Sequence, residues 1–183
     1  MIEKAPLLDE TAVAARDVSY RRIIEDYRKR RLPTIVANTA ACHARIVICN
    51  LLVLASEDAA SIRLVSGRLA AEVYGELGPM ISEAIDGGCD LRVITECGRA
   101  ELTGNQFYQV IHQKRPDSIR CMGIQSTTRQ HMQHYMLVGE TAYRVEFDDL
   151  TRSATACFND ERRLVTGILS RRFEEAWDSL AKD

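Results

Sequence analysis

The sequence predicts one α/β domain in which helices flank a mixed central sheet, and three observations carry this prediction. First, 183 residues with 46% apolar side chains suffice for a single domain with its own core. Second, the strand-like segments 61–66 and 91–95 enclose a segment of helical periodicity, which predicts two neighbouring parallel strands joined by a helix. Third, segments 134–138 and 142–147 flank the tight turn 139–141, a hairpin pattern.

The N-terminal third is expected to add helices to this core. Residues 1–10 are expected to form a flexible tail, 11–58 a helical segment and 59–183 the α/β core, all within one structural domain. Apolar residues from Val13 to Tyr27 recur at helical spacing over 11–31, and Pro33 ends that helix. Segment 34–56 favours a helix, although its stretch 44–54 also fits a central strand.

Later segments alternate between helix and strand. A stripe of apolar residues at every fourth position predicts a helix that Gly78-Pro79 bends or divides, and it consists of Leu69, Val73, Leu77, Ile81 and Ile85. A helix over 102–113, a strand over 118–124 and a polar loop over 125–130 follow. Asn159-Asp160 can cap a final helix, whose expected apolar stripe is Leu164, Ile168, Phe173, Trp177 and Leu180. Trp177 is expected to anchor the core.

Charge and cysteine usage exclude several classes of protein. A net charge of −2 does not indicate a generally basic nucleic-acid binder, but it allows a local basic patch. No apolar run is long enough for a membrane span and no secretory signal is visible, so a cytoplasmic protein with reduced thiols is expected. Only Cys42 and His43 are closely spaced, and adjacent residues rarely share a metal. Neither a metal site nor a cofactor is therefore predicted.

Several segments from Ser61 to Leu180 together resemble one half of a phospholipase D-like fold. They are Arg-Leu-Val-Ser-Gly-Arg-Leu-Ala-Ala-Glu-Val-Tyr at 63–74, His-Tyr-Met-Leu-Val-Gly at 134–139, Tyr-Arg-Val-Glu at 143–146 and Phe-Glu-Glu-Ala-Trp at 173–177. The resemblance implies a His-x-Lys-x4-Asp motif whose histidine attacks phosphorus while its lysine stabilises the negative charge. Members with one motif bring two copies together, so the resemblance also implies a homodimer.

The motif itself is degenerate in this chain. If 135–138 matches the family's apolar strand, Met132 stands at the nucleophile position, His134 at the lysine position and Gly139 at the aspartate position. A shifted match makes His131 the nucleophile but puts Gln133 at the lysine position and Val138 at the aspartate position. Neither alignment gives an intact motif, because methionine cannot attack phosphorus and the shifted match lacks the cation.

Three groups of residues are candidates for a site. His131 and His134 are the catalytic candidates, and the alternative is that both are incidental histidines near a former cleft. Arg144 and Glu146 share one strand face and either bind a ligand or form an ion pair that holds the hairpin. Ser66, Gly67 and Arg68 follow a strand and could bind an anion if they open a helix.

Two arginine-rich segments, 21–31 and 162–172, are interrupted by acidic residues, which favours a solvated face or a partner interface over nucleic-acid contact. The leading hypothesis is a catalytically degenerate phospholipase D-like module that binds a phosphate-containing ligand or nucleic acid, or that assists assembly. The first alternative is an active phosphodiesterase or nuclease that uses His131 or His134. The second is a purely structural protein-interaction domain.

Overall fold

The computed structural model describes residues 10–123, 133–148 and 153–180. Its centre is a seven-stranded mixed sheet of order β1-β7-β6-β5-β2-β3-β4. β2, β3 and β4 are parallel to one another, and the other neighbouring pairs are antiparallel. The strands are β1 (Val36–Asn38), β2 (Ile62–Ser66), β3 (Leu91–Thr95), β4 (Ile119–Cys121), β5 (Tyr135–Val138), β6 (Ala142–Asp148) and β7 (Ser153–Cys157). The predicted α/β class and the mixed sheet are confirmed.

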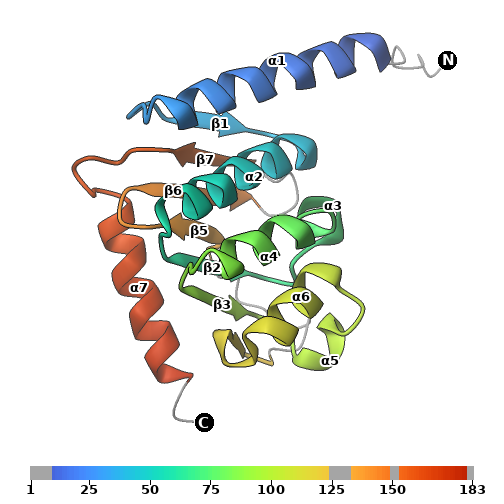
Figure 1. The fold of residues 1–183 in the computed structure, drawn as a ribbon, viewed down its shortest axis with the longest axis vertical. Coiled ribbons are helices and arrows are strands. Elements are labelled where there is room, and N and C mark those ends of the chain that lie inside the picture. The colour runs from blue at the N-terminus through green and yellow to red at the C-terminus, as the bar shows by residue number, and fades with distance from the viewer. Residues whose placement is uncertain (1–9, 124–132, 149–152, 181–183) are drawn as a thin grey trace, which may run out of the picture.

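Helices cover both faces of the sheet (Figure 1). α2 (Ala41–Asp58), α4 (Gly78–Asp86) and α6 (Gln106–Lys114) pack on one face, and α1 (Glu10–Lys29) lies against α2. The short helices α3 (Ala71–Tyr74) and α5 (Arg99–Leu102) lie in the connections, with a 3-10 turn at Pro116–Ser118. α7 (Thr166–Ser179) covers the opposite face over β2 and β5. In the described residues, no helix is long and apolar enough to cross a membrane.

The N-terminal third contains a strand that the sequence did not predict. α1 and α2 confirm the expected helices, and α2 excludes a strand over 44–54. Between them, however, Val36–Asn38 forms β1, which pairs with β7 at the edge of the sheet. Three residues are too few to show a strand periodicity, so only the pairing reveals β1. The segment 11–58 is therefore not an all-helical addition, because it supplies one edge of the sheet.

β7 is the second strand missing from the prediction. Its sequence Ser-Ala-Thr-Ala-Cys consists of small side chains, among which only Thr155 is of a type that clearly favours strands. β7 lies between β6 and β1, and its hydrogen bonds to both strands give it its conformation. The predicted hairpin is confirmed as β5 and β6 with the turn at 139–141, where Gly139 adopts the left-handed conformation that glycine favours.

The apolar stripe predicted over 69–85 is buried along its whole length, but it does not belong to one helix. The chain forms α3 and then α4, which begins at Gly78 with Pro79 in its first turn, the position that proline favours. Leu69 precedes both helices with a positive φ of 52°. Gly78-Pro79 therefore divides the segment, which is one of the two outcomes that the sequence allowed.

The apolar face of α7 differs by one position from the prediction. Leu164 and Ile168 are 65% and 57% exposed, whereas Leu169 is buried together with Phe173 and Trp177. Leu164 precedes the helix, and the face that contacts the sheet runs back from Phe173 in a step of four to Leu169. The predicted stripe was wrong at its first two members. The expectation that Trp177 belongs to the core is confirmed.

Arginines on the sheet hold α7 in place. Glu174 accepts hydrogen bonds from Arg63 of β2 at 2.8 Å and from Arg92 of β3 at 2.6 and 3.0 Å. Although burial alone would raise the pKa of Glu174, Arg92 and Arg63 outweigh it and hold this pKa below its usual value. The guanidinium of Arg92 also lies over the rings of Phe173 and Trp177. These contacts combine charge and aromatic packing on one turn of α7.

Asp160 organises the start of α7, as the sequence predicted. Its carboxylate accepts backbone hydrogen bonds from Leu164, Val165 and Thr166 at 2.9–3.2 Å. Burial raises the pKa of Asp160, but these N–H donors together outweigh burial and lower it below its usual value. The carboxylate thus acts as an N-terminal cap, although Asp160 lies several residues before the helix.

Asp160→Ala should lower the free energy of unfolding by about 1–2 kcal/mol at neutral pH, because three backbone N–H groups at the start of α7 lose their acceptor. The pKa of Asp160 is lowered on folding, so its contribution is present above the unfolded pKa and is lost as pH falls through the folded pKa. Urea unfolding of both proteins at several pH values measures the difference in their free energies of unfolding. This difference should become smaller as the pH is lowered, and a difference that does not change with pH would contradict the capping role.

Candidate functional site

Buried polar side chains form a row across one end of the sheet. The registers align Asn38, Ala154 and Glu146 in one half of the sheet and Ser66, Thr95 and Cys121 in the other. Continuing the pairings of β5 by one residue places His134 between Glu146 and Ser66. His134 directly precedes β5, and its carbonyl accepts a hydrogen bond from Glu146 N at 2.9 Å. We call the side chains of Asn38, Glu146, His134, Ser66 and Thr95 the polar row.

The polar row lies on the α2 side of the sheet. Along the strands, three of its members, His134, Ser66 and Thr95, are each two residues away from a core residue beneath α2 and α4, namely Met136, Leu64 and Val93. Asn38, Ser66 and Thr95 are 2%, 6% and 0% exposed. The parallel strands β2, β3 and β4 all end here, which is where ligands bind in many open α/β sheets.

Arg144 lies two residues before Glu146 on β6, on the same face of the strand. It is 3% exposed. Its Nε donates to Asn38 Oδ1 at 3.2 Å, and its Nη1 lies 3.0 Å from Glu146 Oε2. The ion pair between Arg144 and Glu146, one of the two readings from the sequence, is therefore present. Since it connects β6 to β1 through Asn38, it also fastens the edge of the sheet.

His134 occupies the middle of the row beside Glu96, the residue after β3. His134 Nε2 lies 3.6 Å from Glu96 Oε1, too far for a hydrogen bond. The same nitrogen is buried and has no hydrogen-bond partner in the part of the chain that the structure describes. Glu96 is 4% exposed. A buried ring nitrogen beside a carboxylate can donate to a ligand or to a water molecule.

Gly67 brings β2 close to this histidine. A Cβ atom at Gly67 would lie 3.2 Å from His134 Cε1 and Nε2 and 3.3 Å from Glu96 Oε2. Those separations are tighter than ordinary van der Waals contact, so a side chain here would displace His134 or Glu96. The glycine that the sequence marked as an anion-binding turn therefore makes room for these two side chains.

Ser66, Gly67 and Arg68 do not open a helix, which was the condition for the predicted anion site. Ser66 Oγ accepts a hydrogen bond from Leu69 N at 3.2 Å and holds the turn after β2. Arg68 is exposed, and the next helix starts only at Ala71 and has four residues. So short a helix concentrates little positive potential at its N-terminus. Ser66 instead takes part in the polar row.

Of the two histidines predicted as catalytic candidates, only His134 lies in the residues that the structure describes. His131 and Met132 lie outside the described residues, as does the predicted polar loop over 125–130. Gly139, aligned with the motif's aspartate, occupies the hairpin turn at the other end of β5, and its N–H donates to Ser61 O at 2.8 Å. Sequence reasoning missed Asn38, Thr95 and Glu96. For Thr95 and Glu96, the polar pair directly after the apolar run of β3 was an available signal.

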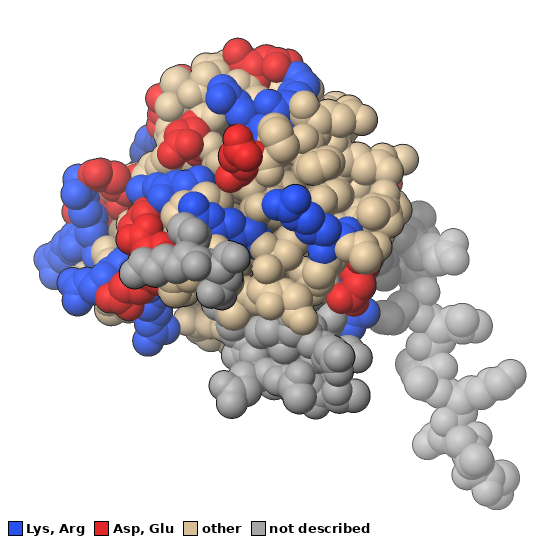
Figure 2. All heavy atoms as spheres, turned by 90° about the horizontal axis from the view of Figure 1, so that it is seen from below, with Lys and Arg blue, Asp and Glu red and all other residues tan. Residues whose placement is uncertain are grey.

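Several arginines of the arginine-rich segments pair with acidic groups. In α1 and the residue pair after it, Arg28 pairs with Glu57, Arg30 with Asp26 and Arg31 with Asp58. Near α7, Arg163 pairs with Glu140. Figure 2 shows basic and acidic side chains interspersed on the face it presents. These contacts agree with a solvated, ion-paired surface.

All six cysteines lie in the described part of the chain and are free thiols there. Cys89, Cys97 and Cys157 are buried, as expected for reduced structural thiols, and burial raises the pKa of Cys89 and Cys157. Cys42, Cys49 and Cys121 are only partly buried. These partly buried thiols are the ones a metal ion or oxidant can reach.

Comparison with known proteins identifies the fold and no family. No protein-family model matches the chain, and no curated protein matches it. A solved structure that matches is TrmBL2, described as an archaeal chromatin protein with a novel mode of DNA binding, with a TM-score of 0.57 and 12% identity. The match covers 93% of this chain and 63% of TrmBL2, so the chain spans less than two thirds of that protein. At this identity the match shows a shared fold alone.

Proposed function

We propose that this chain is a catalytically degenerate phospholipase D-like domain that binds a phosphate-containing ligand at the polar row. The observation that carries the proposal is the buried Nε2 of His134, which lacks a hydrogen-bond partner in the described part of the chain. A buried polar nitrogen without a hydrogen-bond partner costs about 1–3 kcal/mol of stability, and in the tautomer that carries its proton on Nε2, a ligand oxygen would accept the missing hydrogen bond.

The surroundings of His134 support binding rather than hydrolysis. The polar row contains no lysine, and Arg144 is engaged by Asn38 and Glu146. A phosphoryl transfer through histidine needs a cation that is available to stabilise the charge on the phosphoryl oxygens. The N-terminus of α2 lies at the same end of the sheet, three residues after Asn38, and adds partial positive charge. That charge favours an anion without supplying a nucleophile or an acid.

DNA is the second candidate ligand, and the structural match to TrmBL2 favours it. The net charge of −2 and the ion-paired arginines speak against a uniformly basic surface. DNA binding by this chain would therefore rest on a few local phosphate contacts. Such binding weakens steeply as salt rises, in proportion to the number of contacts.

A saturating phosphorylated ligand should raise the melting temperature of the wild-type protein by about 5–10 °C, because a ligand at 100 times its Kd adds about 2.7 kcal/mol to the native state. The measurement is a thermal shift series with inorganic phosphate, mononucleotides, a dinucleotide and a short DNA duplex at two salt concentrations. His134→Asn should abolish the shift. His112→Asn, which changes an exposed histidine on α6, is the matched control and should keep it.

Measurements on the wild type and on these histidine variants also distinguish the alternative functions. No shift with any of these ligands would remove phosphate recognition and leave a structural interaction domain. A shift with the duplex alone, lost at the higher salt, would assign the function to DNA. Hydrolysis of a generic phosphodiester that disappears in His134→Asn or His131→Asn would show that catalysis survives and would overturn the proposal.

A further inference from the structure

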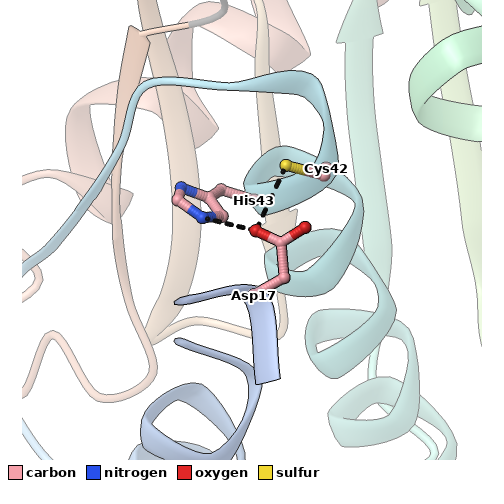
Figure 3. Close-up of side chains that lie close together, drawn as sticks. All are labelled: Asp17, Cys42 and His43. Carbon is pink, nitrogen blue, oxygen red and sulfur yellow. Dashed lines mark hydrogen bonds and ion pairs between the residues drawn. The ribbon is translucent and has the colours of Figure 1, made fainter. Parts of the chain in front are cut away.

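Side chains from two helices converge at the N-terminus of α2. Asp17 comes from α1, while Cys42 and His43 lie in the first turn of α2 (Figure 3). Asp17 Oδ1 lies 3.2 Å from His43 Nε2 and 3.7 Å from Cys42 Sγ. One potential ligand atom from each of the three residues lies within 4.8 Å of the other two. The group therefore presents oxygen, nitrogen and sulfur toward one point.

These separations fit a tetrahedral metal ion. Zinc binds carboxylate oxygen and imidazole nitrogen at about 2.0–2.2 Å and thiolate sulfur at about 2.3 Å, so ligand atoms around it lie roughly 3.3–3.7 Å apart. The 3.7 Å between Asp17 Oδ1 and Cys42 Sγ lies within this range, and the 3.2 Å between Asp17 Oδ1 and His43 Nε2 lies just below it. A thiolate and a carboxylate also carry the two negative charges that a divalent cation neutralises, with the imidazole neutral.

The helix arrangement removes the objection that adjacent residues rarely share a metal. The side chains of Cys42 and His43 point in different directions around the axis of α2. However, α1 packs against α2 and places Asp17 close to both of them. Tyr20, one turn after Asp17 on α1, stacks on the imidazole of His43 with ring centroids 4.1 Å apart. Its hydroxyl donates to Ala37 O at 3.1 Å. Tyr20 thereby fixes the plane of the ring, as supporting residues do at metal sites.

A cavity adjoins the cluster. It has a volume of about 410 Å³, and its lining includes Asp17 and Cys42 together with Arg21, Arg45 and Met80. Asp17 and His43 are 35% and 24% exposed, so an ion can reach them from solvent. A metal held by three protein atoms keeps a fourth position for water or a ligand, and here that position has the cavity beside it.

We propose that Asp17, Cys42 and His43 bind one Zn²⁺ ion with an open fourth position toward this cavity. Binding converts the thiol of Cys42 to a thiolate, and its proton goes to the solvent. Thiolate and imidazole select zinc and similar transition metals over magnesium and calcium. The proposed zinc ligands do not include His134, and the proposal does not depend on the ligand proposed for the polar row.

Cobalt titration of the full chain in a non-chelating phosphine reductant tests the site. Co²⁺ should bind one ion per chain and give a near-ultraviolet thiolate-to-metal charge-transfer band with tetrahedral visible absorption, and Zn²⁺ should displace it. Cys42→Ser should lose the band. Asp17→Asn should weaken binding at least about tenfold, since even supporting residues at metal sites cost 10–100-fold. Circular dichroism of the metal-free variants checks that each one is folded.

Cys49→Ser is the matched control, because Cys49 lines the same cavity but its thiol lies 3.4 Å from Met80 Sδ, outside the cluster. This variant should keep both the band and the affinity. A band that persists in Cys42→Ser, a band lost in Cys49→Ser, or no charge-transfer band in wild type would each overturn the proposal. Affinity that is unchanged in Asp17→Asn would overturn the three-ligand assignment.

Discussion

Arg144→Met should lower the free energy of unfolding by about 3–5 kcal/mol, because it leaves the carboxylate of Glu146 buried without its cation. Both side chains are almost fully buried, at 3% and 8% exposure. The substitution also removes the hydrogen bond to Asn38, which connects β6 to β1. Chemical denaturation at neutral pH measures the loss, and the edge formed by β1 should be the first part of the sheet to exchange its amide protons.

A double-mutant cycle separates the ion pair from the packing of the Arg144 side chain. Arg144→Met combined with Glu146→Gln should recover part of the lost stability, since the second change removes the uncompensated charge. Arg163→Met is the surface control, because Arg163 pairs with Glu140 where the two side chains are 58% and 68% exposed. Exposed pairs contribute about 0–1 kcal/mol. Equal losses at Arg144 and Arg163 would show that burial of the pair does not matter.

Phe173→Ala should also cost about 3–5 kcal/mol, through the cavity it leaves between α7 and the sheet. Phe173 is fully buried and stacks on Trp177 with ring centroids 5.7 Å apart. The guanidinium of Arg92 lies over the same ring, so the substitution removes a cation–π contact as well. Denaturant unfolding measures the loss, and the fluorescence of Trp177, the one tryptophan in the chain, reports whether α7 has loosened.

Phe147 supplies the matched control for this prediction. It is 66% exposed on β6, and Phe147→Ala should change the free energy of unfolding by less than about 0.5 kcal/mol. Leu169, buried one turn before Phe173, should behave like Phe173 when it is replaced by alanine, whereas the exposed Ile168 should not. A larger loss at Ile168 than at Leu169 would support the stripe predicted from the sequence and contradict the observed face of α7.

Several features of the fold followed from local patterns in the sequence. β2, β3 and the hairpin are recognisable because each element repeats its apolar residues with its own period. α1 and α2 are long enough for their periodicity to be detected, and Asp160 has the chemistry of a cap. Within the site, His134, Arg144, Glu146 and Gly67 were identified because polar residues and glycine next to apolar strands are visible without coordinates.

Only the tertiary structure decided how distant segments meet. β1 and β7 are strands because each hydrogen-bonds to neighbours far away in the sequence, and neither has a pattern of its own. Strand register brings Asn38 into the polar row and places Glu96 beside His134. Asp17 reaches Cys42 and His43 because α1 packs on α2, a contact across 25 residues of chain. Periodicity describes which face of an element is buried, whereas register and helix packing decide which side chains share a site.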